Sequence, residues 1–254
     1  MNVDKWIKQN AHNLDGQTIA ITGSTGGIGK QVCKILASLN ANLILLNRSM
    51  DSSNKQKEEL LNVNPKIKID ILTIDMSDFN SVKNCIENLK KFDRIDTLIL
   101  NSGAYAIPRK ITDIGYDNVF QINFVSPYFL VKSILPILRK SKNPKVVLTS
   151  SIAHNYSKID EKDIDFRTRK KSNKVYGNSK RFITFSLMEL FKENSDIALS
   201  IVHPRITFTN ITNHYPKLIY HIIKYPMKVI FMSNKKACLN IIKGVFDKTD
   251  YMQW

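Results

Sequence analysis

Short apolar runs alternate with longer amphipathic stretches along the chain of 254 residues. The apolar runs have the length of fully buried strands. We expect strands at residues 18–22, 42–47, 67–74, 97–101, 145–150 and 197–202. The stretches between them space their apolar residues three and four apart, which predicts helices at residues 29–39, 52–62, 77–91, 116–138, 172–192 and 235–246.

This alternation of strand and helix predicts the fold class. Strands that are apolar on both faces are typical of a parallel sheet with helices on both sides. We therefore expect one α/β domain over residues 1–254, doubly wound, with a mainly parallel sheet of six or seven strands. Such folds bind ligands at the carboxyl ends of their strands, so the residues after each strand are the first candidates for a site.

A glycine-rich loop follows the first predicted strand. It reads TGSTGGIG and leads directly into the first predicted helix. Gly23 suits a sharp turn, Gly27 a close approach of ligand and backbone, and Gly29 tight packing of helix on sheet. Because N–H groups at a helix start bind phosphate, the loop predicts a pyrophosphate site made by Gly23, Ser24, Thr25, Gly27, Ile28 and Gly29. The alternative is a glycine-rich turn without a ligand.

Residues after the next two strands bear on the kind of nucleotide. The second strand ends at Asn47, followed by Arg48, where an NAD site usually has a carboxylate for the ribose hydroxyls. An amide and a guanidinium favour a 2′-phosphate instead, so we expect NADP rather than NAD. The alternative for Arg48 is a plain surface arginine. Asp75 and Met76 follow the third strand, where a side-chain acceptor reaches the adenine amino group.

A tyrosine and a lysine four residues apart indicate acid–base chemistry. Tyr176 and Lys180 would share one face of a predicted helix. A neighbouring ammonium favours phenolate and lowers the pKa of the tyrosine, which then exchanges a proton with a carbonyl or an alcohol. Tyr220 and Lys224 have the same spacing, but only the first pair follows a predicted strand ending in a serine pair. A serine there, such as Ser151, would donate a hydrogen bond to the substrate oxygen.

These motifs, in this order, resemble the classical short-chain dehydrogenase/reductases over nearly the whole chain. The TGSTGGIG loop matches the cofactor loop of that family. The turn Asn101, Ser102 and Gly103, after the fourth strand, is similar to the family's Asn-Ala-Gly turn. The resemblance implies a Rossmann-type fold in which the cofactor contacts both segments.

The resemblance also implies a catalytic set. Tyr176 would transfer the proton, and Lys180 would tune it and bind the nicotinamide ribose. Ser151 would orient the substrate oxygen. Asn123, in the segment FQINF, would support Lys180 through a water.

The gap between Ser151 and Tyr176 resembles the branch that contains retinol dehydrogenases, which implies a small or lipophilic carbonyl or alcohol substrate. Pro204 and Thr209 match positions beside the nicotinamide, but Arg205 stands where the family usually has glycine. We expect residues 204–233 to form a lid over the substrate; the alternative, which we do not favour, is a basic helix on a membrane surface.

Composition limits the partners. The net charge of +16 is spread along the chain, so we expect no nucleic-acid partner. Cys33, Cys85 and Cys238 are odd in number and far apart, which argues against disulfides and a metal cluster and predicts a cytoplasmic protein. No unbroken apolar stretch reaches ~18 residues. A homo-oligomer that forms through two long helices is a possibility that the sequence leaves open.

The sequence therefore predicts an NADP(H)-dependent oxidoreductase that transfers hydride between the nicotinamide and a carbonyl or alcohol. Arg205 leaves a second hypothesis open, an NADP-binding protein with weak or no catalysis and a regulatory or interaction role.

Overall fold

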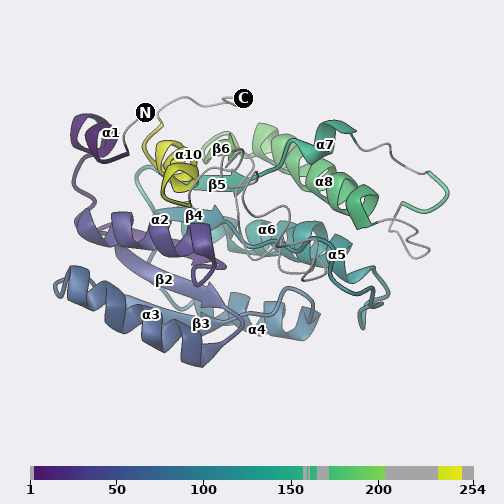
Figure 1. Ribbon diagram of the computed structural model, residues 1–254, viewed down its shortest axis with the longest axis horizontal. Helices are drawn as coiled ribbons and strands as arrows, with labels where there is room; N and C mark the ends of the chain where they lie inside the picture. The colour runs from purple at the N-terminus through teal and green to yellow at the C-terminus, as the bar shows by residue number, and fades with distance from the viewer. Residues whose placement is uncertain (1–2, 157–158, 160, 165–171, 204–233, 248–254) are drawn as a thin grey trace, which may run out of the picture.

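Six parallel strands form the centre of the computed structural model (Figure 1). The structure describes residues 3–156, 159, 161–164, 172–203 and 234–247. Across the sheet the order is β3-β2-β1-β4-β5-β6. The strands are β1 Thr18–Thr22, β2 Asn42–Asn47, β3 Ile69–Thr73, β4 Thr97–Leu100, β5 Lys145–Thr149 and β6 Ala198–Val202.

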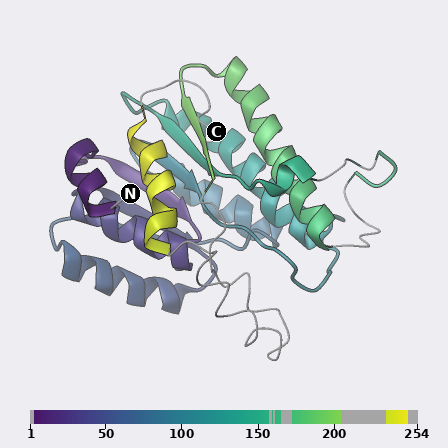
Figure 2. The ribbon, with the colours of Figure 1, turned by 45° about the horizontal axis from the view of Figure 1, so that its top comes forward.

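Helices cover both faces of the sheet, and each face has its own hydrophobic core. On one face α2 (Gly27–Ser38) packs between α3 (Met50–Val63) and α10 (Asn234–Phe246), and Figure 2 shows these three helices side by side. The other face holds α4 (Phe79–Leu89), α6 (Ser126–Leu138) and α8 (Ser172–Glu193). This arrangement confirms the expected α/β fold with a doubly wound parallel sheet.

The winding of the sheet reverses at β1. This strand pairs with β2 on one side and with β4 on the other, both in parallel. The chain therefore leaves the carboxyl ends of β1 and β4 toward opposite faces, and a crevice for a ligand forms between them. The glycine-rich loop and the Asn101 turn both begin at this point.

Several boundaries differ from the expected ones. β1 and β2 lie as predicted, but β3 begins at Ile69 because the preceding residues form a turn. The long helix expected from residue 116 begins at Asn118, and its second turn is a π-helix, η1 (Gln121–Val125), between α5 (Asn118–Phe120) and α6. The sequence did not predict α1 (Val3–Asn10), which is joined to α10 by an ion pair between Asp4 and Lys235 at 2.8 Å. The predicted lid at residues 204–233 lies outside the described residues.

The segment Asn118–Leu138 is long and apolar enough to cross a membrane. However, 56% of its most apolar window is buried inside the fold. The segment packs against α4 and α8 within the core of one sheet face. Its apolar character therefore has a sufficient explanation in the core of this domain.

Candidate active site

The glycine-rich loop turns sharply at the end of β1. Gly23 has a φ of +65°, in the left-handed region that favours glycine. Its N–H donates to the carbonyl oxygen of Leu46 at 2.9 Å, which fixes the turn to β2. α2 then begins at Gly27 with no side-chain cap on its N-terminus and no acidic residue in its first turn. Its first N–H groups and the positive end of its dipole suit a pyrophosphate.

Asn101 and Gly29 close this turn from two sides. The amide Nδ2 of Asn101 donates to the carbonyl oxygens of Thr22 at 3.1 Å and Gly23 at 2.9 Å. A Cβ at Gly29 would overlap the oxygen of Gly23 and lie 2.8 Å from Nδ2 of Asn101. Glycine is therefore required there, because the loop itself and Asn101 occupy the space of a side chain. The N–H groups of Asn101 and Ser102 both donate to the Thr22 hydroxyl, each at 3.0 Å, so the two predicted cofactor segments form one unit.

A buried polar network lies beneath the loop and includes Asn47. The side chain of Asn47 is 4% exposed, and its Nδ2 donates to the hydroxyls of Ser24 at 2.7 Å and Ser53 at 2.9 Å. Gln56 completes the network, because it accepts from the Ser24 hydroxyl at 2.7 Å and donates to the Ser24 carbonyl at 2.9 Å. The Asn47 side chain is thus directed under the loop, whereas the next residue, Arg48, is exposed.

Ser53 and Gln56 were not among the residues predicted from the sequence. The sequence did offer a signal for them. Ser53 and Gln56 are small or polar residues three apart, so they share the face of the helix that packs against the loop. Ile28, predicted beside the pyrophosphate, has its side chain in the core. The N–H of Thr25, also predicted at the pyrophosphate site, donates to Oδ1 of Asn47 at 3.4 Å.

The turn after β3 is held in place by its neighbours. The Asp75 carboxylate accepts from the N–H of Ser77 at 2.8 Å and from its hydroxyl at 2.7 Å. The carbonyl oxygen of Met76 accepts from the Ser126 hydroxyl at 2.7 Å and from Gln121 at 3.3 Å. These contacts orient the turn that the sequence assigns to adenine.

Asn123 lies in the π-helical turn and clamps the loop after β4. Its Nδ2 donates to the carbonyl oxygen of Ala104 at 2.8 Å, and its Oδ1 accepts from the Ala104 N–H at 2.8 Å. The same Nδ2 donates to the hydroxyl of Ser179 on α8 at 3.1 Å. A π-helical turn redirects side chains within a helix and is frequent at functional sites. Support of Lys180 through water stays a prediction.

Tyr176, Lys180 and Ser151 meet at the carboxyl ends of β4 and β5. The ammonium of Lys180 is buried and donates to the Thr149 carbonyl oxygen at 3.0 Å. A Cβ at Gly103 would lie 3.4 Å from this nitrogen, so the predicted cofactor turn and Lys180 are neighbours. The Ser151 side chain lies close enough to Tyr176 to lower the pKa of that tyrosine. The structure thus brings together the four residues that the sequence predicted as catalytic.

Burial controls the ionisation of both helix residues. It raises the pKa of Tyr176, while the Ser151 side chain acts in the opposite direction and the neighbouring Tyr105 adds to the rise. Burial lowers the pKa of Lys180 to about 8. The sequence predicted a lowered pKa for Tyr176, but desolvation by the surrounding fold raises it.

His154 lies beside Ser151. It lies in the short helix α7 (Ala153–Tyr156), and its Nδ1 hydrogen-bonds with the carbonyl oxygen of Ser151. Its own carbonyl oxygen accepts from Nε of Arg181 at 3.0 Å. His154 thus ties Ser151 to α8. Pro204, Arg205, Thr209 and the second tyrosine–lysine pair lie outside the described residues.

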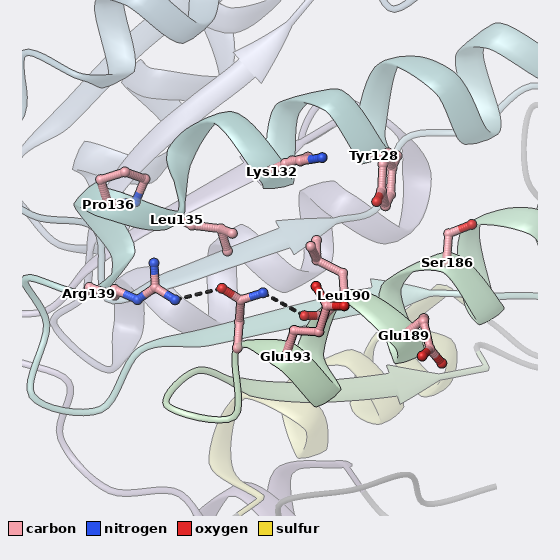
Figure 3. A pocket seen from close by; sticks show the side chains of 10 residues that line it. Tyr128, Lys132, Leu135, Pro136, Arg139, Ser186, Glu189, Leu190 and Glu193 are labelled. Atoms are coloured by element: carbon pink, nitrogen blue, oxygen red, sulfur yellow. Dashed lines mark hydrogen bonds between the residues drawn. The ribbon is translucent and has the colours of Figure 1, made fainter.

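A cleft of about 570 Å³ lies between α6 and α8 (Figure 3). It contains none of the predicted site residues. Its walls carry Lys132 from α6 and both Glu189 and Glu193 from α8. One end is closed by Arg139, which pairs with Asp196 at 2.6 Å and donates to Asn194 at 2.6 Å. The cleft belongs to the outer surface of these two helices.

A phosphate-binding loop at the switch point of a parallel sheet, beside a buried tyrosine–lysine pair, defines a dinucleotide-binding α/β protein. Residues 17–217 match the model of the short chain dehydrogenase family. The chain therefore belongs to the short-chain dehydrogenase family, whose members are oxidoreductases that act on CH–OH and C=O groups.

Curated relatives support this placement. The chain is 27% identical to human retinol dehydrogenase 13 over 205 residues, which cover 79% of this chain and 62% of that protein. It is 28% identical over 218 residues to the short-chain dehydrogenase TIC 32 A of Brassica napus chloroplasts, with 80% and 68% covered. The chain thus spans about three fifths to two thirds of the length of these relatives.

The fold also matches solved structures. An NADP active-site complex of Pseudomonas aeruginosa RhlG superposes with a TM-score of 0.71 at 20% identity, covering 94% of this chain and 93% of that one. This likeness concerns the fold.

The buried ammonium of Lys180 predicts a pH dependence of stability. Its pKa falls from an ordinary 10.5 to about 8 on folding. Between these values the unfolded chain holds a proton that the folded protein has released, so the stability contribution rises as pH increases from about 8 to 10.5. Urea unfolding of wild type and Lys180→Met should show a stability difference that moves in favour of wild type across this window. Parallel curves for the two proteins would contradict burial of the ammonium.

Proposed function

We propose that this protein is an NADP(H)-dependent oxidoreductase that interconverts a carbonyl and an alcohol. The observation that carries the proposal is the meeting of Tyr176, Ser151 and Lys180 beside the Gly103 turn. These groups lie at the carboxyl ends of β4 and β5, next to the switch point where the glycine-rich loop begins. A proton-transfer group thus lies next to a dinucleotide site.

The residues present fit the cofactor. The uncapped N-terminus of α2 would bind the pyrophosphate, the exposed Arg48 a 2′-phosphate, and the Asp75 turn the adenine. Gly103 leaves room beside Lys180 for the nicotinamide ribose. The bound cofactor supplies hydride chemistry, and the protein supplies orientation and proton transfer.

The proton step follows from the three side chains. In reduction, the hydroxyl of Tyr176 gives its proton to the substrate oxygen, while Ser151 holds that oxygen by a hydrogen bond. The positive charge of Lys180 stabilises the resulting phenolate. Because burial raises the pKa of Tyr176, the tyrosine is protonated at neutral pH and ready to donate. In alcohol oxidation the same groups move the proton in reverse.

Replacing Tyr176 with phenylalanine tests this role. Tyr176→Phe removes the proton donor while keeping the ring, so kcat should fall by roughly 10²- to 10⁴-fold with little change in NADPH affinity. Turnover on a panel of lipophilic aldehydes, ketones and alcohols, with fluorescence titration of NADPH, measures both quantities. Tyr128→Phe, in the α6–α8 cleft that contains none of the proposed site residues, is the matched control.

Two outcomes would contradict the mechanism. Full turnover in Tyr176→Phe would show that Tyr176 is not the proton donor. Tight NADPH binding by wild type without turnover on any member of the panel would favour the alternative, a cofactor-binding protein with an interaction role.

Replacing Arg48 tests the preference for NADP. Arg48→Ala should raise the Kd of NADPH by roughly tenfold to hundredfold, the size of a lost hydrogen bond to a charged group, and leave the Kd of NADH unchanged. Lys66→Ala removes the same charge from an exposed position just before β3, at the opposite end of the strands, and should change neither value. Equal losses for both cofactors in Arg48→Ala would contradict a 2′-phosphate contact.

The proposed substrate is a small or lipophilic alcohol or carbonyl compound. The relatives include a retinol dehydrogenase, named for a lipophilic alcohol, and the proposal extends that kind of substrate to this chain. The proposed compartment is the cytoplasm. Its support is that all three cysteines are buried free thiols, as a reducing environment maintains them.

Self-association through α6 and α8 stays a prediction. The outer face of these helices exposes Phe185, 50% accessible, beside the cleft with Lys132 and the two glutamates. A twofold axis would place the lysine of one copy opposite the glutamates of the other. Sedimentation equilibrium should detect a dimer that weakens in Phe185→Glu and persists in Met50→Glu, a change at an exposed residue of α3. A monomer at all concentrations would contradict it.

A further inference from the structure

A second tyrosine packs against Tyr176. The ring of Tyr105 meets that of Tyr176 edge-on, with ring centroids 5.0 Å apart and an interplanar angle of 78°. Such edge-to-face pairs are attractive and directional. Tyr105 lies in the loop after β4, two residues beyond Gly103, so it comes from a different part of the chain than the proposed catalytic side chains.

The loop that carries Tyr105 is fixed on both sides of this residue. Before it, Ala104 is held through its N–H and its carbonyl oxygen by the amide of Asn123, both at 2.8 Å. After it, Ala106 has a φ of +51°, in the left-handed region that non-glycine residues rarely adopt. A strained residue held next to a proposed active site indicates a functional constraint on the loop.

From this geometry we propose that Tyr105 is a positioning residue of the active site, which holds the ring of Tyr176 in its reactive orientation. The proposal rests on the assignment of Tyr176 as the acid/base residue. It also gives Asn123 a task in this protein that the sequence did not predict. Asn123 clamps Ala104 and thereby sets where Tyr105 meets Tyr176.

The surroundings of Tyr176 make this contact measurable. The titratable groups near it in the described part of the chain are Tyr105, Lys180 one turn along α8, and His154, which binds Ser151. The charge interaction between the two tyrosines raises the pKa of Tyr176. Removal of the Tyr105 hydroxyl should therefore lower the pKa of Tyr176, which reports that the two side chains lie next to each other.

The decisive experiment follows the titration of Tyr176 directly. NMR of protein carrying isotope-labelled tyrosine, with Tyr176→Phe to assign the signal, gives this pKa without any need for turnover. Tyr105→Phe keeps the ring and should shift the titration of Tyr176 to lower pH. Tyr116→Phe, in the same aromatic cluster but in ring contact with Phe120, should leave the titration as in wild type.

A kinetic arm separates ring packing from the hydroxyl. Tyr105→Leu removes the ring and should lower kcat by roughly tenfold to hundredfold, the cost of a misplaced catalytic group, with little change in the KM for NADPH. An unchanged titration in Tyr105→Phe, or an unchanged kcat in Tyr105→Leu, would overturn the proposal. Failure of the proposed function shows separately, as turnover that survives Tyr176→Phe.

Discussion

The closed turn between β1 and α2 is the constraint on which the rest of the site depends. Here the chain must leave a buried strand, reverse at Gly23 and begin a helix within a few residues. The carbonyl of Gly23 fills the space where a side chain at Gly29 would lie, and Asn101 donates to that carbonyl and to Thr22. The turn therefore joins β1, α2 and the end of β4 into one rigid unit. Because this unit needs no side-chain cap on α2, the first N–H groups of the helix stay directed toward a ligand.

The proposed proton-transfer residues are placed by contacts that begin at the same unit. The chain runs from Asn101 through Gly103 to Ala104, which Asn123 clamps by two hydrogen bonds. Asn123 also binds α8 through Ser179, close to Tyr176 and Lys180 on that helix. The glycine-rich loop and the proposed proton donor are therefore mechanically linked through β4. This link explains how a flexible ligand could be held with its reactive end at one phenol.

The local pattern of apolar residues and glycines was sufficient to predict the strands, the glycine-rich loop and the helices that carry the site. The strand, loop and helix at the start of the chain are contiguous, and glycine spacing directly reflects backbone needs at Gly23 and Gly29. The pairing of Tyr176 with Lys180 follows from helical geometry. By contrast, the direction of Asn47 depends on Ser53 and Gln56, which reach it only when α3 packs beside the loop. The rise in the Tyr176 pKa also depends on burial by distant segments, and so does the contact with Tyr105. No spacing rule reports such tertiary effects.

A crystal structure of the protein with bound NADP tests the central claim, that one nucleotide connects the glycine-rich loop to the tyrosine–lysine pair. The account predicts the pyrophosphate at the N-terminus of α2, the 2′-phosphate beside Arg48, and the nicotinamide ring next to the hydroxyl of Tyr176. Density for the cofactor at any other place, or a nicotinamide turned away from Tyr176, would contradict it.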